Sequence, residues 1–301
     1  MNIELLKKKK GAIILAHYYT NPEIQEIADF TGDSLALAQE AKKTEANIIV
    51  FAGVHFMAET AKILNPLKKV LVPDFNAGCS LSDSCKASDL QQFKNQHPDH
   101  KVITYINSSI GVKMISDVIC TSSNAVKIVN SFPKNEKIIF APDKNLGGYI
   151  NKLTGREMIL WNGSCHVHNQ LHTENIIKLK MQYPDAIVIA HPECQDVILK
   201  LADFVGSTLQ MLNFTKTSEV KKFIVATETG ILYQMKKASP EKDFFVVPAD
   251  QNCNCNDCPY MKMNTLENIY DCLENESNEL LLTEEQIQKG YIPLQRMLDL
   301  S

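Results

Sequence analysis

The stretch IILAHYY at residues 13–19 decides the fold, because a short apolar run ending in polar or aromatic residues recurs twice further along the chain. The later copies are VITYIN at residues 102–107 and IVIAHPE at residues 187–193. When His17, Tyr105 and His191 are taken as equivalent, they lie 88 and 86 residues apart. This period is too long for a solenoid. The sequence therefore indicates three copies of a small domain.

Five further features recur in order after these residues. An aspartate lies twelve residues on in each copy: Asp29, Asp117 and Asp203. A hydroxyl lies seventeen residues on: Ser34, Ser122 and Thr208. Two apolar runs follow in each copy, at 48–51 and 70–72, at 138–140 and 158–160, and at 223–225 and 245–247. A cysteine then follows: Cys79, Cys165, and either Cys253 or Cys258.

Apolar runs alternate with helical spacing in every copy. Helical spacing covers residues 35–43, 123–131 and 209–214, and the recurring hydroxyl beside each stretch fits an N-cap. Buried strands separated by helices are typical of parallel sheets covered on both faces. We therefore predict an α/β fold of three homologous three-layer α/β/α domains with small parallel sheets, in a pseudo-threefold arrangement around a central active site. Their bounds are residues 1–84, 85–170 and 171–258.

The tail at residues 259–301 lies outside the triplication. Residues 265–273 and 283–290 have helical spacing, and Thr283 with Gln286 fits a capping box. We expect this C-terminal helical tail to pack back on the first repeat.

The polar residues after the first strands should meet at one edge, because binding groups in parallel sheets collect beyond the carboxyl ends of the strands. These residues are His17, Tyr19, Tyr105, Asn107, His191 and Glu193. Three helix N-termini with a hydroxyl each would bind anions such as phosphate and carboxylates. The chain has neither the glycine-rich dinucleotide fingerprint nor the P-loop motif.

Composition limits the classes of partner. The 31 basic and 35 acidic residues give a net charge of −4, which does not favour nucleic-acid binding. No apolar run approaches the length of about 18 residues that a membrane span needs, and no secretory signal is evident. We expect a soluble, cytoplasmic protein without a membrane partner.

The nine cysteines are too few for a disulfide scaffold in a chain of this length. One cysteine per repeat, brought to a common centre, suits a metal centre with an open coordination position. A local alternative is a zinc site within residues 253–258, which hold three cysteines. We interpret Cys120, Cys194 and Cys272 as packing residues and Cys85 as spare.

A set of motifs in this order resembles the quinolinate synthase family from about residue 11 to residue 272. The motifs are AHYY at 16–19, TGDS at 31–34, AGC at 77–79, TYIN at 104–107, TSSNA at 121–125, PDKNLG at 142–147, WNGSCHVH at 161–168, AHPEC at 190–194, GST at 206–208, ATETG at 226–230 and CPYM at 258–261. The resemblance implies three α/β/α domains around one [4Fe-4S] cluster per chain. It also selects Cys258 over Cys253, so that the implied ligands are Cys79, Cys165 and Cys258.

The activity that the resemblance implies is the condensation of iminoaspartate with dihydroxyacetone phosphate. Phosphate and water are lost, and quinolinate is formed for NAD biosynthesis. The cluster would act as a Lewis acid, and an aspartate-oxidising enzyme is a possible functional link. The alternative is an iron–sulfur or zinc protein that binds or senses an anionic metabolite without catalysis.

Roles for single residues follow as hypotheses. Tyr19 and Glu193 are the first choices for proton transfer, with His17 and His191 beside them. Hydroxyls that should hold phosphate or carboxylate belong to Ser34, Ser122, Ser207 and Thr208. We expect Tyr105 and Asn107 to position the substrate, and His168 to orient it or to support the Cys165 ligand.

Overall fold

Three sheets, each of four parallel strands, form the framework of the computed structural model, which describes residues 2–249 and 256–301. The first sheet has the order β2-β1-β3-β4, with β1 at Ala12–His17, β2 at Phe30–Gly32, β3 at Ile48–Ala52 and β4 at Lys69–Leu71. The second has the order β6-β5-β7-β8, with β5 at Lys101–Tyr105, β6 at Val118–Cys120, β7 at Ile138–Ala141 and β8 at Ile159–Leu160. The third has the order β10-β9-β11-β12, with β9 at Ile187–Ala190, β10 at Phe204–Val205, β11 at Lys222–Ala226 and β12 at Asp243–Val246. The same strand order in every repeat confirms the predicted fold class.

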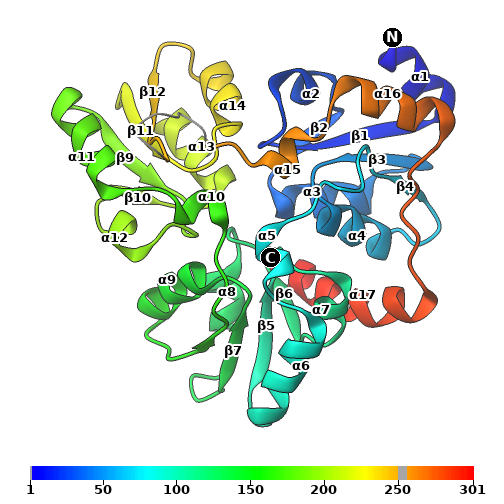
Figure 1. Ribbon diagram of the computed structural model, residues 1–301, viewed down its shortest axis with the longest axis horizontal. Coiled ribbons are helices and arrows are strands. Elements are labelled where there is room, and N and C mark those ends of the chain that lie inside the picture. Colours follow the sequence, from blue (N-terminus) through cyan, green and yellow to red (C-terminus); the bar gives the residue numbers. More distant parts are fainter. Residues whose placement is uncertain (1, 250–255) are drawn as a thin grey trace.

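Helices cover both faces of the sheets. Those of the first repeat are α1 (Ile3–Lys10), α2 (Pro22–Ile27), α3 (Ser34–Lys43), α4 (His55–Leu64) and α5 (Ser80–Asp83). Those of the second are α6 (Ala87–Gln96), α7 (Ile110–Met114), α8 (Ala125–Asn130), α9 (Lys144–Thr154) and α10 (His166–Asn169). Those of the third are α11 (Thr173–Gln182), α12 (Asp196–Leu199), α13 (Thr208–Thr217) and α14 (Ile231–Ala238). Figure 1 shows the three sheets around a common centre, which α5, α10 and the tail helix α15 (Pro259–Lys262) border.

The recurring aspartate ties the first two strands of each repeat together. Asp29 Oδ2 accepts a hydrogen bond from the Ile14 N–H at 2.7 Å, and the Asp29 N–H donates to Ile14 O at 2.9 Å. The same two bonds join Asp117 to Val102 and Asp203 to Val188. The sequence had shown the recurrence of this residue without its role.

We expect Asp117→Ala to lower the free energy of unfolding by about 1–3 kcal/mol, because it leaves the Val102 N–H without its charged acceptor at 2.8 Å. Chemical denaturation of the two chains measures the difference. Asp99→Ala is the control, because Asp99 is 79% exposed and only faces Lys137 at 3.9 Å. An equal loss of stability in both variants would contradict the role of Asp117.

The prediction that the recurring hydroxyls are helix N-caps is wrong, because the N-cap residue of each helix lies one or two positions away from the hydroxyl. Asp33 and Ser207 are the N-caps of α3 and α13, and their side chains accept from the Ala36 N–H and the Gln210 N–H. Helix α8 begins at Ala125 and not at residue 123. A turn precedes it, in which Asn124 Oδ1 accepts from the Thr121 N–H at 2.7 Å. The hydroxyls of Ser34, Ser122 and Thr208 therefore do not cap these helices.

The tail forms three helices, and they pack in different places. Helix α16 (Leu266–Asn275) buries Ile269, Cys272 and Leu273 in an apolar cluster with residues of β1 and β3 in the first repeat. Helix α17 (Glu284–Asp299) has the predicted capping box and runs nine residues beyond the expected end. It packs against α4 of the first repeat but also against α7 and β6 of the second. The tail thus joins two repeats.

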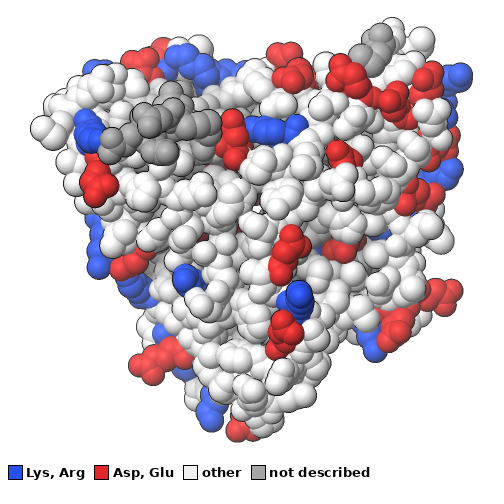
Figure 2. All heavy atoms as spheres, in the orientation of Figure 1, with Lys and Arg blue, Asp and Glu red and all other residues white. Residues whose placement is uncertain are grey.

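The surface and the helices add two observations. Figure 2 shows acidic and basic side chains interspersed with uncharged ones across one face of the molecule. Within residues 2–249 and 256–301, no helix combines the length and the apolar character needed to cross a bilayer.

Candidate active site

One pocket lies where the three repeats meet. Residues from every repeat line it, and they include twelve polar or thiol-bearing positions that the sequence had singled out: His17, Tyr19, Ser34, Cys79, Tyr105, Asn107, Ser122, Cys165, His168, His191, Glu193 and Thr208, together with Cys258 from the end of the third repeat. Ser207 is not among the lining residues. It caps α13, and its hydroxyl lies 2.7 Å from Ser123 Oγ.

The thiols of Cys79, Cys165 and Cys258 occupy equivalent places. Each cysteine is the N-cap residue of a four-residue helix, namely α5, α10 and α15. Burial raises the pKa of Cys79 to about 12 and that of Cys258 to about 11, and it also raises the pKa of Cys165. The backbone N–H three residues after each cysteine acts in the opposite direction. A metal ion that binds such thiols displaces their protons, so that they bind it as thiolates.

The remaining described cysteines have another setting. Cys85, Cys120, Cys194 and Cys272 are buried in separate apolar clusters of the repeats. This burial confirms that Cys120, Cys194 and Cys272 are packing residues. Cys253 and Cys255, which carry the local zinc alternative, lie outside the described residues.

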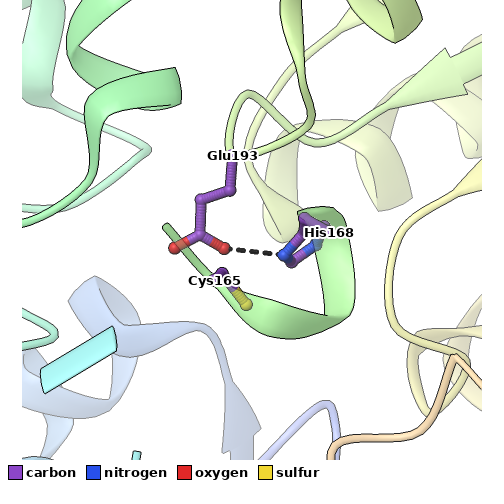
Figure 3. A group of neighbouring side chains, drawn as sticks. All are labelled: Cys165, His168 and Glu193. Carbon is purple, nitrogen blue, oxygen red and sulfur yellow. Dashed lines mark ion pairs between the residues drawn. The ribbon is translucent and has the colours of Figure 1, made fainter. Parts of the chain in front are cut away.

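Glu193 is held between two histidines at the third repeat's edge of the pocket. Its Oε2 lies 2.9 Å from His168 Nδ1 and 3.4 Å from His191 Nδ1. Figure 3 shows the carboxylate pointing at the His168 ring beside the Cys165 thiol. Burial acts to raise the pKa of Glu193, but the charge and hydrogen bonds of His168 and His191 outweigh it and lower the pKa. Glu193 is therefore ionised near neutral pH.

Cys165, His168 and Glu193 also bring one ligand atom each within 4.8 Å of one another, as a single-metal site requires. His168 Nε2 lies 2.9 Å from Thr227 Oγ1, whereas His168 Nδ1 lies 2.9 Å from Glu193 Oε2 but has no hydrogen-bond partner among the residues that the structure describes. A ring nitrogen must be free of a proton and of other partners to bind a metal. The pocket thus holds two candidate donor sets, this one and the three cysteines, and Cys165 belongs to both.

Tyr19 presents its hydroxyl to the same pocket. The hydroxyl lies 3.0 Å from Thr208 Oγ1 and 3.0 Å from Thr227 Oγ1, so that two threonines of the third repeat fix a side chain of the first. Burial raises the pKa of Tyr19 well above its usual value, and the phenol keeps its proton at neutral pH. Burial and the charge of His191 lower the pKa of His17 to about 3.

Two buried oxygen atoms of residues that line the pocket have no hydrogen-bond partner among the residues that the structure describes. They are Asn107 Oδ1 and Glu193 Oε1. Leaving a buried acceptor unpaired costs about 1–3 kcal/mol. Such atoms mark a place where a polar ligand restores the lost hydrogen bonds. Ser122 Oγ, 3.3 Å from His191 Nε2, lies in the same pocket.

Comparison with known proteins decides the family. The profile of the family described as "Quinolinate synthetase A protein" matches residues 1–299. The chain belongs to the quinolinate synthase family. A quinolinate synthase of Microcystis aeruginosa is 56% identical over 299 residues, which cover 99% of this chain and 94% of that protein. One of Chloroherpeton thalassium is 56% identical over 300 residues, with 99% and 93% covered.

Membership of the quinolinate synthase family confirms the resemblance found in the motifs. A third relative, the quinolinate synthase of Synechocystis sp., is also 56% identical, over 299 residues. Relatives at this identity over nearly the whole chain are enzymes by name, and this chain is an enzyme. The non-catalytic alternative is not favoured.

Sequence reasoning missed several residues of this quinolinate synthase site. Thr227 bonds both Tyr19 and His168, and Glu228 lines the pocket, where burial raises its pKa to about 7. Asp33 lines it too, and its Oδ2 accepts from the Ser123 hydroxyl at 2.7 Å. The motifs at 31–34 and 226–230 contained all three. Their contacts form where residues of different repeats come together, so the spacing within one repeat did not indicate a role for them.

Proposed function

We propose that this member of the quinolinate synthase family condenses iminoaspartate with dihydroxyacetone phosphate, with loss of phosphate and water, to give quinolinate. The observation that carries the proposal is the convergence of Cys79, Cys165 and Cys258, from three repeats, on the pocket that also holds Tyr19 and Glu193. An aspartate-oxidising enzyme would supply the imine.

A [4Fe-4S] cluster fits this donor set. Within the described part of the chain, the thiols of Cys79, Cys165 and Cys258 are the cysteine side chains that line the pocket. Four irons with three cysteines leave one iron without a protein ligand. When bound, the group would supply a Lewis-acidic iron that accepts substrate oxygens. Zinc in a structural site takes four protein ligands, which this set does not offer.

Tyr19 and Glu193 are our proposed proton-transfer pair. Tyr19 keeps its proton and can donate it, whereas Glu193 is ionised and can accept one. Dehydration and isomerisation of a sugar phosphate need both actions. His17 and His191, whose pKa values burial lowers, would donate or accept protons beside them.

The anionic groups of the substrates have candidate partners around the pocket. We propose that the hydroxyls of Ser34, Ser122 and Thr208 hold phosphate or carboxylate, because they line the pocket and are not the N-caps of their helices. Ser207 drops out of this group because it caps α13. Tyr105 and Asn107 would position the substrate. His168 would orient the substrate indirectly, by its contact with Glu193.

Anaerobic purification followed by iron and sulfide analysis and an assay with both substrates tests the proposal. We expect about four irons and four sulfides per chain and formation of quinolinate. Zinc without labile sulfide in active protein would overturn the cluster. An intact cluster without quinolinate formation would favour the binding or sensing alternative.

A further inference from the structure

Two buried carboxylates stand at the same place in the second and third repeats. Asp143 and Glu228 each lie two residues beyond the end of the third strand of their repeat, after β7 and β11. Asp143 Oδ2 accepts the Cys165 N–H at 3.2 Å, and Glu228 Oε1 accepts the Cys258 N–H at 3.1 Å. Both side chains are at most 1% exposed. Each carboxylate therefore binds the backbone of a proposed ligand cysteine.

The other carboxylate oxygens are also in use. Asp143 Oδ1 accepts from the Leu146 N–H at 2.7 Å, and Glu228 Oε2 accepts from the Gly230 N–H at 2.6 Å. Each carboxylate thus links the ligand cysteine to the helix start that follows its own strand. Both links use every oxygen as an acceptor, which a carboxylate satisfies and an amide does not.

Glu228 makes a further connection to the first repeat. Lys262, on the helix that Cys258 caps, lies 3.0 Å from Glu228 Oε1 and donates to Tyr19 O at 2.9 Å. The carboxylate therefore joins the Cys258 segment to the loop that carries the proposed acid.

The first repeat has no carboxylate at this place. Its counterpart, two residues beyond β3, is Val54. Here the backbone makes the link, since the His55 N–H donates to Ala77 O at 2.7 Å, two residues before Cys79. A tie between the same two loops is thus present in all repeats, but it depends on a side chain in only two of them.

We propose that Asp143 and Glu228 are positioning residues that hold the backbones of Cys165 and Cys258 in the arrangement that retains the metal centre. The inference rests on the proposed iron–sulfur centre. It does not assign either carboxylate to the reacting atoms. Its prediction concerns how long the centre stays bound.

The test compares the rate of iron loss from anaerobic protein to a ferrous chelator in Asp143→Asn, Glu228→Gln and wild type. An amide must turn an NH2 group toward a backbone N–H in either variant, which breaks one tie. We expect iron loss to be about tenfold faster in each. The melting temperature of each metal-free chain is measured alongside.

Asp117→Ala is the control. Asp117 Oδ2 also accepts a backbone N–H, that of Val102 at 2.8 Å, but this bond joins two strands and does not involve a ligand cysteine. Its loss should lower the melting temperature while iron loss stays within roughly twofold of wild type.

Three outcomes would count against the inference. Iron loss at the wild-type rate in both Asp143→Asn and Glu228→Gln would overturn this inference and would leave the proposed function intact. Equally fast iron loss in Asp117→Ala would overturn the inference too, because general destabilisation would then explain the effect. A wild-type chain without iron would overturn the proposed function, and this inference with it.

Discussion

Replacing Cys165 with serine is expected to reduce quinolinate formation to background and to lower the iron and sulfide content of the chain. A serine hydroxyl stays protonated where a thiolate is required, and a buried site gives it no help in ionising. Cys165 is one of three thiols on the pocket, one from each repeat, so that no neighbouring thiol of the described chain replaces it there. Iron and sulfide analysis of anaerobic protein, with a quinolinate assay, measures both effects.

Cys272→Ser is the matched control for this variant. Cys272 is a buried residue of α16, and its thiol donates to Ser277 O at 3.2 Å, a bond that serine can keep. The control should retain iron, sulfide and activity. Normal iron and sulfide in Cys165→Ser would remove Cys165 from the ligand set and, with it, the three-thiol centre.

Tyr19→Phe is expected to slow turnover by about 10²–10⁴-fold while iron and sulfide stay at wild-type levels. The change removes one oxygen atom and with it the proton that the raised pKa of Tyr19 retains. The Thr208 and Thr227 hydroxyls, both 3.0 Å from that oxygen, also lose their shared partner. The steady-state kcat and the absorption spectrum of the metal centre are the measurements.

A surface tyrosine gives the comparison for the loss of a hydroxyl. The Tyr233 hydroxyl donates to Glu26 at 2.6 Å, away from the pocket lining. Tyr233→Phe should leave kcat unchanged. Full activity in Tyr19→Phe would refute its role as proton donor, and a lost metal spectrum would show a structural role instead.

Local patterns predicted the sheets because the two central strands of each sheet are almost entirely buried. The five residues of β3 are all buried, and such a run is apolar throughout. The recurrence at a fixed offset also picked out Asp29, Asp117 and Asp203, although only the strand pairing shows that they bind backbone N–H groups. Periodicity thus located these residues, and their partners came from the fold.

The N-caps were misassigned for a local reason. Asp33 and Ser207 stand immediately before the recurring hydroxyls of Ser34 and Thr208, and either neighbour has a side chain that can cap a helix. Composition cannot decide between two adjacent candidates. The backbone can, because the N-cap residue has extended φ and ψ angles while the next residue is helical.

Contacts between repeats could not be predicted from one repeat. The apolar face of α17 indicates that this helix packs against other elements. It does not indicate that Gly290 lies beside Ile63 of the first repeat and Ile110 of the second. Glu228 and Asp143 likewise follow their strands without a local sign of their partners, which are cysteine backbones 30 and 22 residues further on. Such contacts depend on how the repeats meet.

The identical bonding of the recurring aspartate in all three sheets points to an ancestral gene that was copied twice and joined end to end. The copies differ today. Val54 stands where the other two repeats have Asp143 and Glu228, and Glu193 stands where they have Tyr19 and Asn107, so that one cavity presents a different group on each of its sides.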